Sequence, residues 1–161
     1  MGKGLKETRD YIFFWGSFLS NFHDVDEDIL HDGHLFPTSE HIFMYEKAKL
    51  FGDLEKANEI IFARTPMQAK RLGREVQGFN DELWEKNREA IMIKALKAKF
   101  KKGTKEYDML KATKNKTLVE GSPYDRIWGV GLHYDDKKIL NPNNWRGLNL
   151  LGKSLMKVRE R

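Results

Sequence analysis

Two residues with the types and spacing for chemistry are Glu40 and Lys47, a carboxylate and an amine within residues 37–48. A proline and two hydroxyl residues open this stretch, which predicts a helix start because a hydroxyl can cap the free amides of the first turn. At about 100° per residue, Glu40, Met44, Lys47 and Phe51 then share one face. Such a stripe could present both charges to a reacting group, although a solvated surface helix would carry the same charges.

Further candidates lie outside this helix. Asp125 would supply a second carboxylate, and two carboxylates beside a sugar can stabilise an oxocarbenium-like state and handle the proton of the leaving group. The indoles of Trp84 and Trp128 could stack on a base, although the spacing of Trp84 also fits core packing. A desolvated Lys47 amine could trap an opened ribose as a Schiff base. Direct attack by water stays open as the alternative.

The elements that must position these side chains are mostly helices separated by capping signals. We expect an α+β, predominantly helical fold with a few short strands, as a single domain over residues 1–161. Residues 1–10 are expected to be loosely ordered. Helical spacing and caps predict one helix that begins at residue 38 or 39 and another that begins at residue 66. They also predict helices at 54–64, 82–100, 104–112 and 148–159. Apolar, β-rich runs predict strands at 11–15 and 117–120.

Composition excludes some classes of protein but does not identify a single class. The net charge of +5 suits phosphate-bearing partners and does not single out nucleic acid. No long apolar run or signal peptide occurs, and there is no cysteine, so we expect a cytoplasmic protein with no membrane partner. The motifs of the commonest serine hydrolases, nucleotide-binding proteins and zinc proteases do not occur either.

Two charged segments have alternative interpretations. Lys70, Arg71 and Arg74 form a basic cluster around a glycine, which suits phosphate binding but is also typical of a solvated helix face. Residues 23–34 read as a loop or weak hairpin rich in carboxylates. Its His31-x-x-His34 pair has metal-ligand spacing, but no clear element fixes the two imidazoles. We predict no metal site and no cofactor.

Over nearly its whole length the chain resembles the NADAR superfamily, also called YbiA-like proteins. The matching motifs occur in family order: Phe14 with Ser20-Asn21-Phe22; Pro37-Thr38-Ser39-Glu40-His41 with Lys47; Ala69-Lys70-x-x-Gly73-Arg74; Trp84 before Ala95-Leu96-x-Ala98-Lys99-Phe100; Leu118-Val119-Glu120; Asp125-x-x-Trp128-Gly129; and Asn144-Trp145-x-Gly147-x-Asn149-x-Leu151-Gly152. Each motif is weak alone, whereas seven in order are specific.

The resemblance implies metal-independent hydrolysis of the N-glycosidic bond of ribosylated bases. It implies a catalytic role for Glu40, for Lys47 as the Schiff-base candidate, and for Asp125. Substrate-binding positions implied by the same motifs are Trp84, Trp128, Asn21, Phe14, Arg74 and Asn149.

The implied substrate is a phosphorylated ribosyl compound, and the family offers two branches. One removes ADP-ribose from guanine in DNA or RNA, and the other hydrolyses ribosylamino-pyrimidine phosphate intermediates of riboflavin synthesis. Residues 78–81 and 122–126 resemble the first branch more, which makes ADP-ribosylated nucleic acid the expected partner. The acidic residues 23–34 count against tight nucleic-acid docking. A non-catalytic ADP-ribose or nucleotide-binding module is the alternative from another class.

Overall fold

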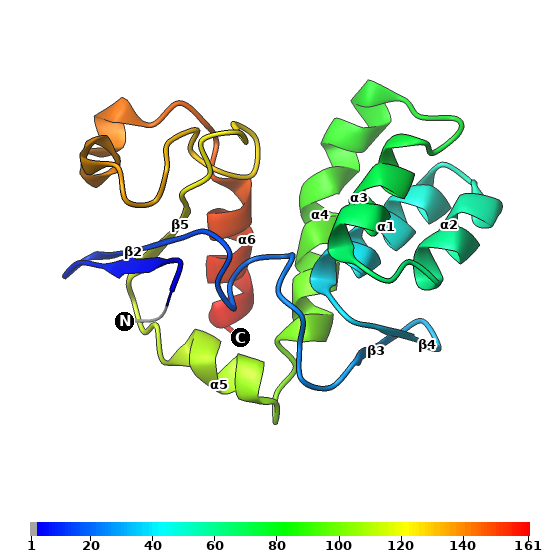
Figure 1. The fold of residues 1–161 in the computed structure, drawn as a ribbon, viewed down its shortest axis with the longest axis horizontal. Coiled ribbons are helices and arrows are strands. Elements are labelled where there is room, and N and C mark those ends of the chain that lie inside the picture. Colours follow the sequence, from blue (N-terminus) through cyan, green and yellow to red (C-terminus); the bar gives the residue numbers. More distant parts are fainter. Residues whose placement is uncertain (1–2) are drawn as a thin grey trace. The chain divides into compact units, whose positions relative to one another are not determined.

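The computed structural model describes residues 3–161, which form two compact units (Figure 1). Among the described residues, the first comprises residues 3–20 with Lys102–Arg161, and the second is Asn21–Lys101. The fold is α+β and predominantly helical, as the sequence predicts. Within residues 3–161 no helix is both long and apolar enough to cross a membrane.

The first unit contains a three-stranded sheet with strand order β1-β2-β5, where β1 is Leu5–Glu7, β2 is Tyr11–Phe14 and β5 is Thr117–Glu120. The central strand β2 pairs antiparallel with β1 and parallel with β5. The predicted loose ordering of residues 1–10 is therefore wrong for β1, because its backbone is paired with β2. Residues 1–2 lie outside the described part of the chain.

The apolar run of β2 follows from its central place in the sheet, where both faces are covered. Phe13 packs in a buried cluster on one face, and Phe14 is also completely buried. The other buried members of the Phe13 cluster are Val119, Val130, Leu132 and Ile139.

Two helices and two short 3-10 turns complete this unit: α5 at Lys105–Lys111, η1 at Lys137–Leu140, η2 at Pro142–Asn144 and α6 at Leu150–Arg159. Helix α6 packs along β5 and buries Leu151, Leu155 and Val158. The predicted start at residue 148 is two residues early, because the helix begins at Leu150, and half of the Leu148 side chain is exposed.

The second unit is a helical cluster with one hairpin. Its elements are β3 at Ile29–His31, β4 at His34–Phe36, α1 at Ser39–Leu50, α2 at Leu54–Ile61, α3 at Pro66–Arg74 and α4 at Asp81–Lys99. Helix α1 packs against α2, α3 and α4, which stand together around it in Figure 1. Each helix starts at a side-chain cap, contributed by Thr38, Asp53, Thr65 and Asn80. Such caps typically stabilise a helix by about 1 kcal/mol.

The β3–β4 hairpin turns at Asp32 and Gly33, which both have positive φ, as a tight two-residue turn requires. Lys49 and Tyr45 of α1 donate hydrogen bonds to the Asp32 carboxylate and hold its pKa at about 2. On the same side of α1, His31 Nε2 lies 3.0 Å from Glu46 Oε2. His31 is thus paired with a carboxylate of α1, a contact that the metal interpretation of this segment did not foresee.

Candidate active site

Helix α1 is buried on nearly all sides. Every residue from Ser39 to Glu46 is buried, and only 7% of Glu40 is exposed. The alternative interpretation, in which Glu40 and Lys47 lie on a solvated surface helix, is therefore wrong. A carboxylate is kept in such a place only with compensating contacts, because desolvating an isolated charge is costly.

Asn21 holds the start of α1. Its backbone carbonyl accepts a hydrogen bond from the Glu40 amide at 3.1 Å, and its Oδ1 accepts one from Ser39 Oγ at 2.9 Å. Its Nδ2 donates to Met92 Sδ of α4 at 3.1 Å. Asn21 therefore positions the first turn of α1, and with it Glu40. Its predicted contact with substrate stays a prediction.

His41 fastens the same turn to the loop after α2. Its Nε2 lies 2.9 Å from the Ala63 carbonyl oxygen, which can only accept, so this nitrogen is assigned the proton. Nδ1 then accepts from the Thr38 hydroxyl at 2.7 Å, and Thr38 Oγ1 accepts from the His41 amide. Burial lowers the pKa of His41, although the bond to Ala63 and the charges of Asp24 and Asp28 oppose that shift.

The lowered pKa of His41 predicts a loss of stability in acid. The unfolded histidine binds a proton near its ordinary pKa of about 6.5, whereas the folded one does so only at lower pH. The free energy of unfolding should therefore fall as the pH drops below about 6.5. Urea denaturation at a series of pH values would measure the effect. His41→Gln should flatten that pH dependence, whereas exposed His34→Gln should retain it; equal profiles in both variants would contradict the assignment.

The Lys47 amine lies in aromatic surroundings beside two charges. Its Nζ is 4.9 Å from the ring centroid of Phe79 and 5.3 Å from that of Trp84. Burial lowers the pKa of Lys47, the negative charge of Glu40 raises it, and the positive charge of Arg74 lowers it. Glu40, Lys47, Arg74 and Trp84, four of the residues predicted from sequence, therefore share one neighbourhood. The contact with Phe79 was not foreseen, because a loop aromatic carries no periodic signal.

Gly73 explains how α3 approaches this neighbourhood. A Cβ atom on Gly73 would lie 2.0 Å from Met44 Sδ on α1, so any larger residue would require the Met44 side chain to move. Arg74 follows directly, and Lys70 lies one turn earlier with its Nζ 5.7 Å from the ring centroid of Phe22. The glycine of the predicted basic cluster thus serves close helix packing. As a result, α3 brings Arg74 close to Lys47, whereas Lys70 lies beside Phe22.

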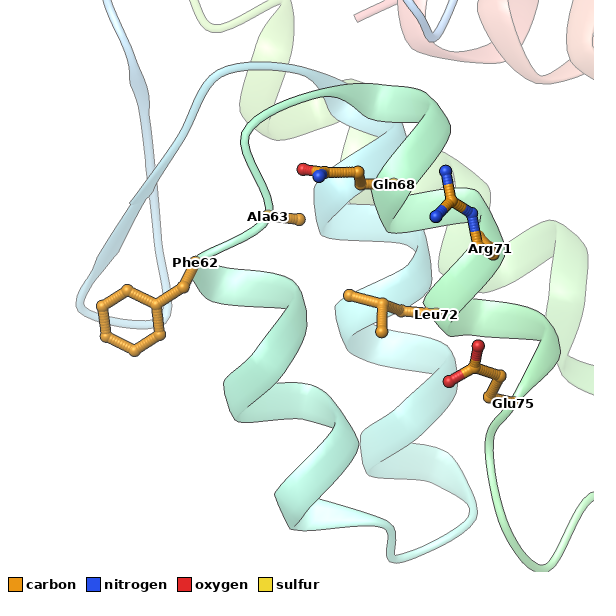
Figure 2. Close-up of a pocket in the computed structure, with 6 residues that line it drawn as sticks. All are labelled: Phe62, Ala63, Gln68, Arg71, Leu72 and Glu75. Carbon is orange, nitrogen blue, oxygen red and sulfur yellow. The ribbon is translucent and has the colours of Figure 1, made fainter.

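Arg71 belongs to a different surface. A hollow of about 280 Å³ lies between the end of α2 and the outer side of α3, lined by Phe62, Ala63, Gln68, Arg71, Leu72 and Glu75 (Figure 2). In Figure 2 the ring of Phe62 points away from the side chains of α3. On the helical wheel, Lys70 and Arg74 fall on the other side of Gly73 from Leu72. Of the predicted basic cluster, Arg71 lines this hollow, whereas Lys70 and Arg74 do not.

In the first unit, Asp125 organises the turn that carries Trp128. Asp125 Oδ1 accepts hydrogen bonds from the amides of Ile127 at 2.9 Å and Trp128 at 2.8 Å. Gly129 follows in a confined place, since a Cβ there would lie 3.0 Å from the carbonyl oxygens of Asp125 and Glu120. The spacing Asp125-x-x-Trp128-Gly129 thus has a local structural cause. A catalytic role for Asp125 and base stacking by Trp128 stay predictions.

Asn149 has a structural function in the same unit. It adopts a left-handed conformation with φ of 54°, its Nδ2 donates to the Leu118 carbonyl, and its Oδ1 accepts from the Glu120 amide, both at 3.0 Å. Its amide therefore fastens the start of α6 to β5. Substrate contacts by Asn149 and by the fully buried Phe14 stay predictions, and the observed packing accounts for both residues without them.

The predicted site residues therefore form two sets, one in each unit. The set around α1 combines a buried carboxylate, an amine and an indole. Comparison with known proteins defines the class: the NADAR domain model matches residues 6–161. The chain belongs to the NADAR domain family.

Several relatives have informative names. A protein of Acanthamoeba polyphaga mimivirus, named as an N-glycosidase, is 36% identical over 96% of this chain and 97% of its own length. N-glycosidase YbiA of Escherichia coli is 37% identical over 80% of this chain and 72% of its own. The solution structure of E. coli YbiA matches with a TM-score of 0.74, 32% identity, and coverage of 98% of this chain and 88% of that one. A chloroplastic maize protein named for riboflavin biosynthesis is 35% identical over 77% of this chain but only 19% of its own length.

Proposed function

We propose that this protein is an N-glycosidase that hydrolyses the bond between a base nitrogen and C1′ of a phosphorylated ribose. The observation that carries the proposal is the neighbourhood of α1, where a buried carboxylate, Glu40, and a half-buried amine, Lys47, lie beside the indole of Trp84. A base can stack on an indole, and a carboxylate can stabilise positive charge that develops on the sugar. The names of the mimivirus and bacterial relatives support the same reaction class.

The cations of α3 support a phosphorylated substrate. Lys70 and Arg74 lie one turn apart on α3, with Arg74 close enough to lower the pKa of Lys47 and Lys70 beside the ring of Phe22. Because their like charges would repel each other, an anion between them would be stabilised. We propose that these two side chains contact a substrate phosphate, and that Asp125 and Trp128 act as the second carboxylate and a further stacking residue.

The proposed substrate is ADP-ribosylated guanine in DNA or RNA. A ribosylamino-pyrimidine phosphate is the second candidate, and the name of the maize relative favours it. The exposed carboxylates Asp24, Glu27 and Asp28 disfavour a tightly bound polyanion. A substrate recognised mainly through one modified nucleotide agrees with both this acidic segment and the cations of α3.

A parallel assay tests the proposal. The purified protein would be incubated with ADP-ribosylated guanine in DNA and with the ribosylamino-pyrimidine phosphate, and released base would be quantified by liquid chromatography. We expect release from the first substrate, and faster release from the second would reassign the substrate branch. Ligand binding without release of base from either compound would refute the glycosidase proposal and favour a non-catalytic reader.

A further inference from the structure

Arg88 lies on the face of α4 that meets the start of α1. It is one helical turn from Trp84 and one turn from Met92, so the three side chains follow one stripe. Both ends of the stripe have known contacts: the Trp84 ring lies 5.4 Å from that of Phe43, and Met92 accepts the hydrogen bond from Asn21. Arg88 therefore lies between two points where α4 touches the elements that hold Glu40 and Lys47.

The Nε of Arg88 is buried, yet it has no hydrogen-bond partner among residues 3–161. Buried polar groups are almost always paired, and an unpaired buried donor costs about 1–3 kcal/mol. Arg159 offers a comparison within the chain, because its guanidinium donates to Thr113 Oγ1 and to the Lys116 carbonyl. A purely structural arginine in this protein thus finds acceptors, and Arg88 does not.

The chemistry of the guanidinium indicates which acceptor is missing. Its planar array of donors matches phosphate and carboxylate oxygens, and a charge-assisted bond is about twice as strong as a neutral one. The proposed substrate is phosphorylated, so its phosphate oxygens are the strongest acceptors that it would bring beside α4.

We propose that Arg88, on α4, binds a phosphate group of the substrate. The inference rests on the proposed function, since it names a further substrate-binding residue of the same site. The proposal also gives the buried Nε of Arg88 a function, which its packing within residues 3–161 does not provide. Arg88 was not among the residues predicted from sequence, because one arginine on a helix with many charges has no distinguishing pattern.

Binding of ribose 5-phosphate tests the inference independently of turnover. Calorimetric titration should show that Arg88→Gln weakens binding by about tenfold to a hundredfold, with partial recovery in Arg88→Lys. Lys86→Gln is the matched control, because Lys86 is exposed, lies on the same helix and carries the same charge; it should bind as the wild type does. Unchanged affinity in Arg88→Gln, or no binding of ribose 5-phosphate by the wild type, would overturn the inference.

Kinetics separate binding from a structural effect. In Arg88→Gln the KM for the phosphorylated substrate should rise about tenfold or more with little change in kcat, whereas the dephosphorylated nucleoside should be hydrolysed as by the wild type. Equal losses on both substrates, accompanied by a lower melting temperature, would assign Arg88 a merely structural role. A wild-type protein that binds ribose 5-phosphate through Arg88 but releases no base would refute the glycosidase proposal alone.

Discussion

Replacing Glu40 with glutamine is expected to lower kcat by about 10²–10⁴-fold, the usual contribution of a positioned acid or base. Glutamine keeps the shape of the side chain and can still form hydrogen bonds within the first turn of α1. It cannot carry the negative charge or exchange the proton that cleavage of the N-glycosidic bond requires. Single-turnover measurements of base release, with ligand affinity determined separately, would show whether the loss lies in kcat.

Glu46→Gln is the matched control for this experiment. Glu46 lies on the same helix and has the same 7% exposure, but it is bound by His31 and Lys94. Burial raises its pKa, yet these two bonds outweigh that effect and hold the pKa below its usual range. Glu46→Gln should therefore lower the free energy of unfolding while leaving kcat close to that of the wild type. Turnover by Glu40→Gln at the wild-type rate would contradict the catalytic assignment.

Local chemistry in the sequence was sufficient to predict where most helices begin. Thr38 caps α1 and Thr65 caps α3, as their hydroxyls and the nearby prolines indicate. The strand Thr117–Glu120 also occurs at the predicted positions. These features depend on a few neighbouring residues, so a single sequence contains the information.

Contacts between distant segments could not be predicted in this way. The parallel pairing of Tyr11–Phe14 with Thr117–Glu120 joins residues about a hundred positions apart, and no local pattern encodes it. β1 has only three residues and exists because β2 offers it a free edge. The last helix was predicted from residue 148, but the left-handed conformation of Asn149 excludes residues 148 and 149 from the helix, which begins at Leu150.

In the candidate site, too, local features could be predicted from the sequence and long-range contacts could not. Spacing alone placed Glu40 and Lys47 on one face of a helix. The burial of that helix depends on partners from other elements, such as the Asn21 carbonyl at its start and the indole of Trp84 beside Lys47. The buried Nε of Arg88 depends on packing in the same way.

Replacing Lys47 with alanine is expected to lower kcat by about 10²-fold or more, because the amine would act directly on the reacting ribose as a nucleophile or proton carrier. Burial lowers the pKa of Lys47, so its neutral, nucleophilic form is more populated near neutral pH than that of an exposed lysine. The amine can attack C1′ as the base leaves with a proton. Opening of the ribose ring, with transfer of a proton from Nζ to the ring oxygen, then gives a Schiff base between C1′ and Nζ, which water hydrolyses to free the sugar and the amine. Borohydride would reduce that imine to a stable secondary amine.

Lys49 is the matched control for the trapping experiment. It lies on the same helix, but its bond to Asp32 raises its pKa, so it is held in the charged form. Mass spectrometry after addition of borohydride during turnover should find a sugar adduct in the wild type and in Lys49→Ala, and none in Lys47→Ala. An active wild type that forms no adduct across the pH range of activity would favour direct attack by water. Lys47 would then act through its charge, and its lowered pKa would set the alkaline limit of activity, because the protonated form that carries this charge is lost as the pH rises through that value.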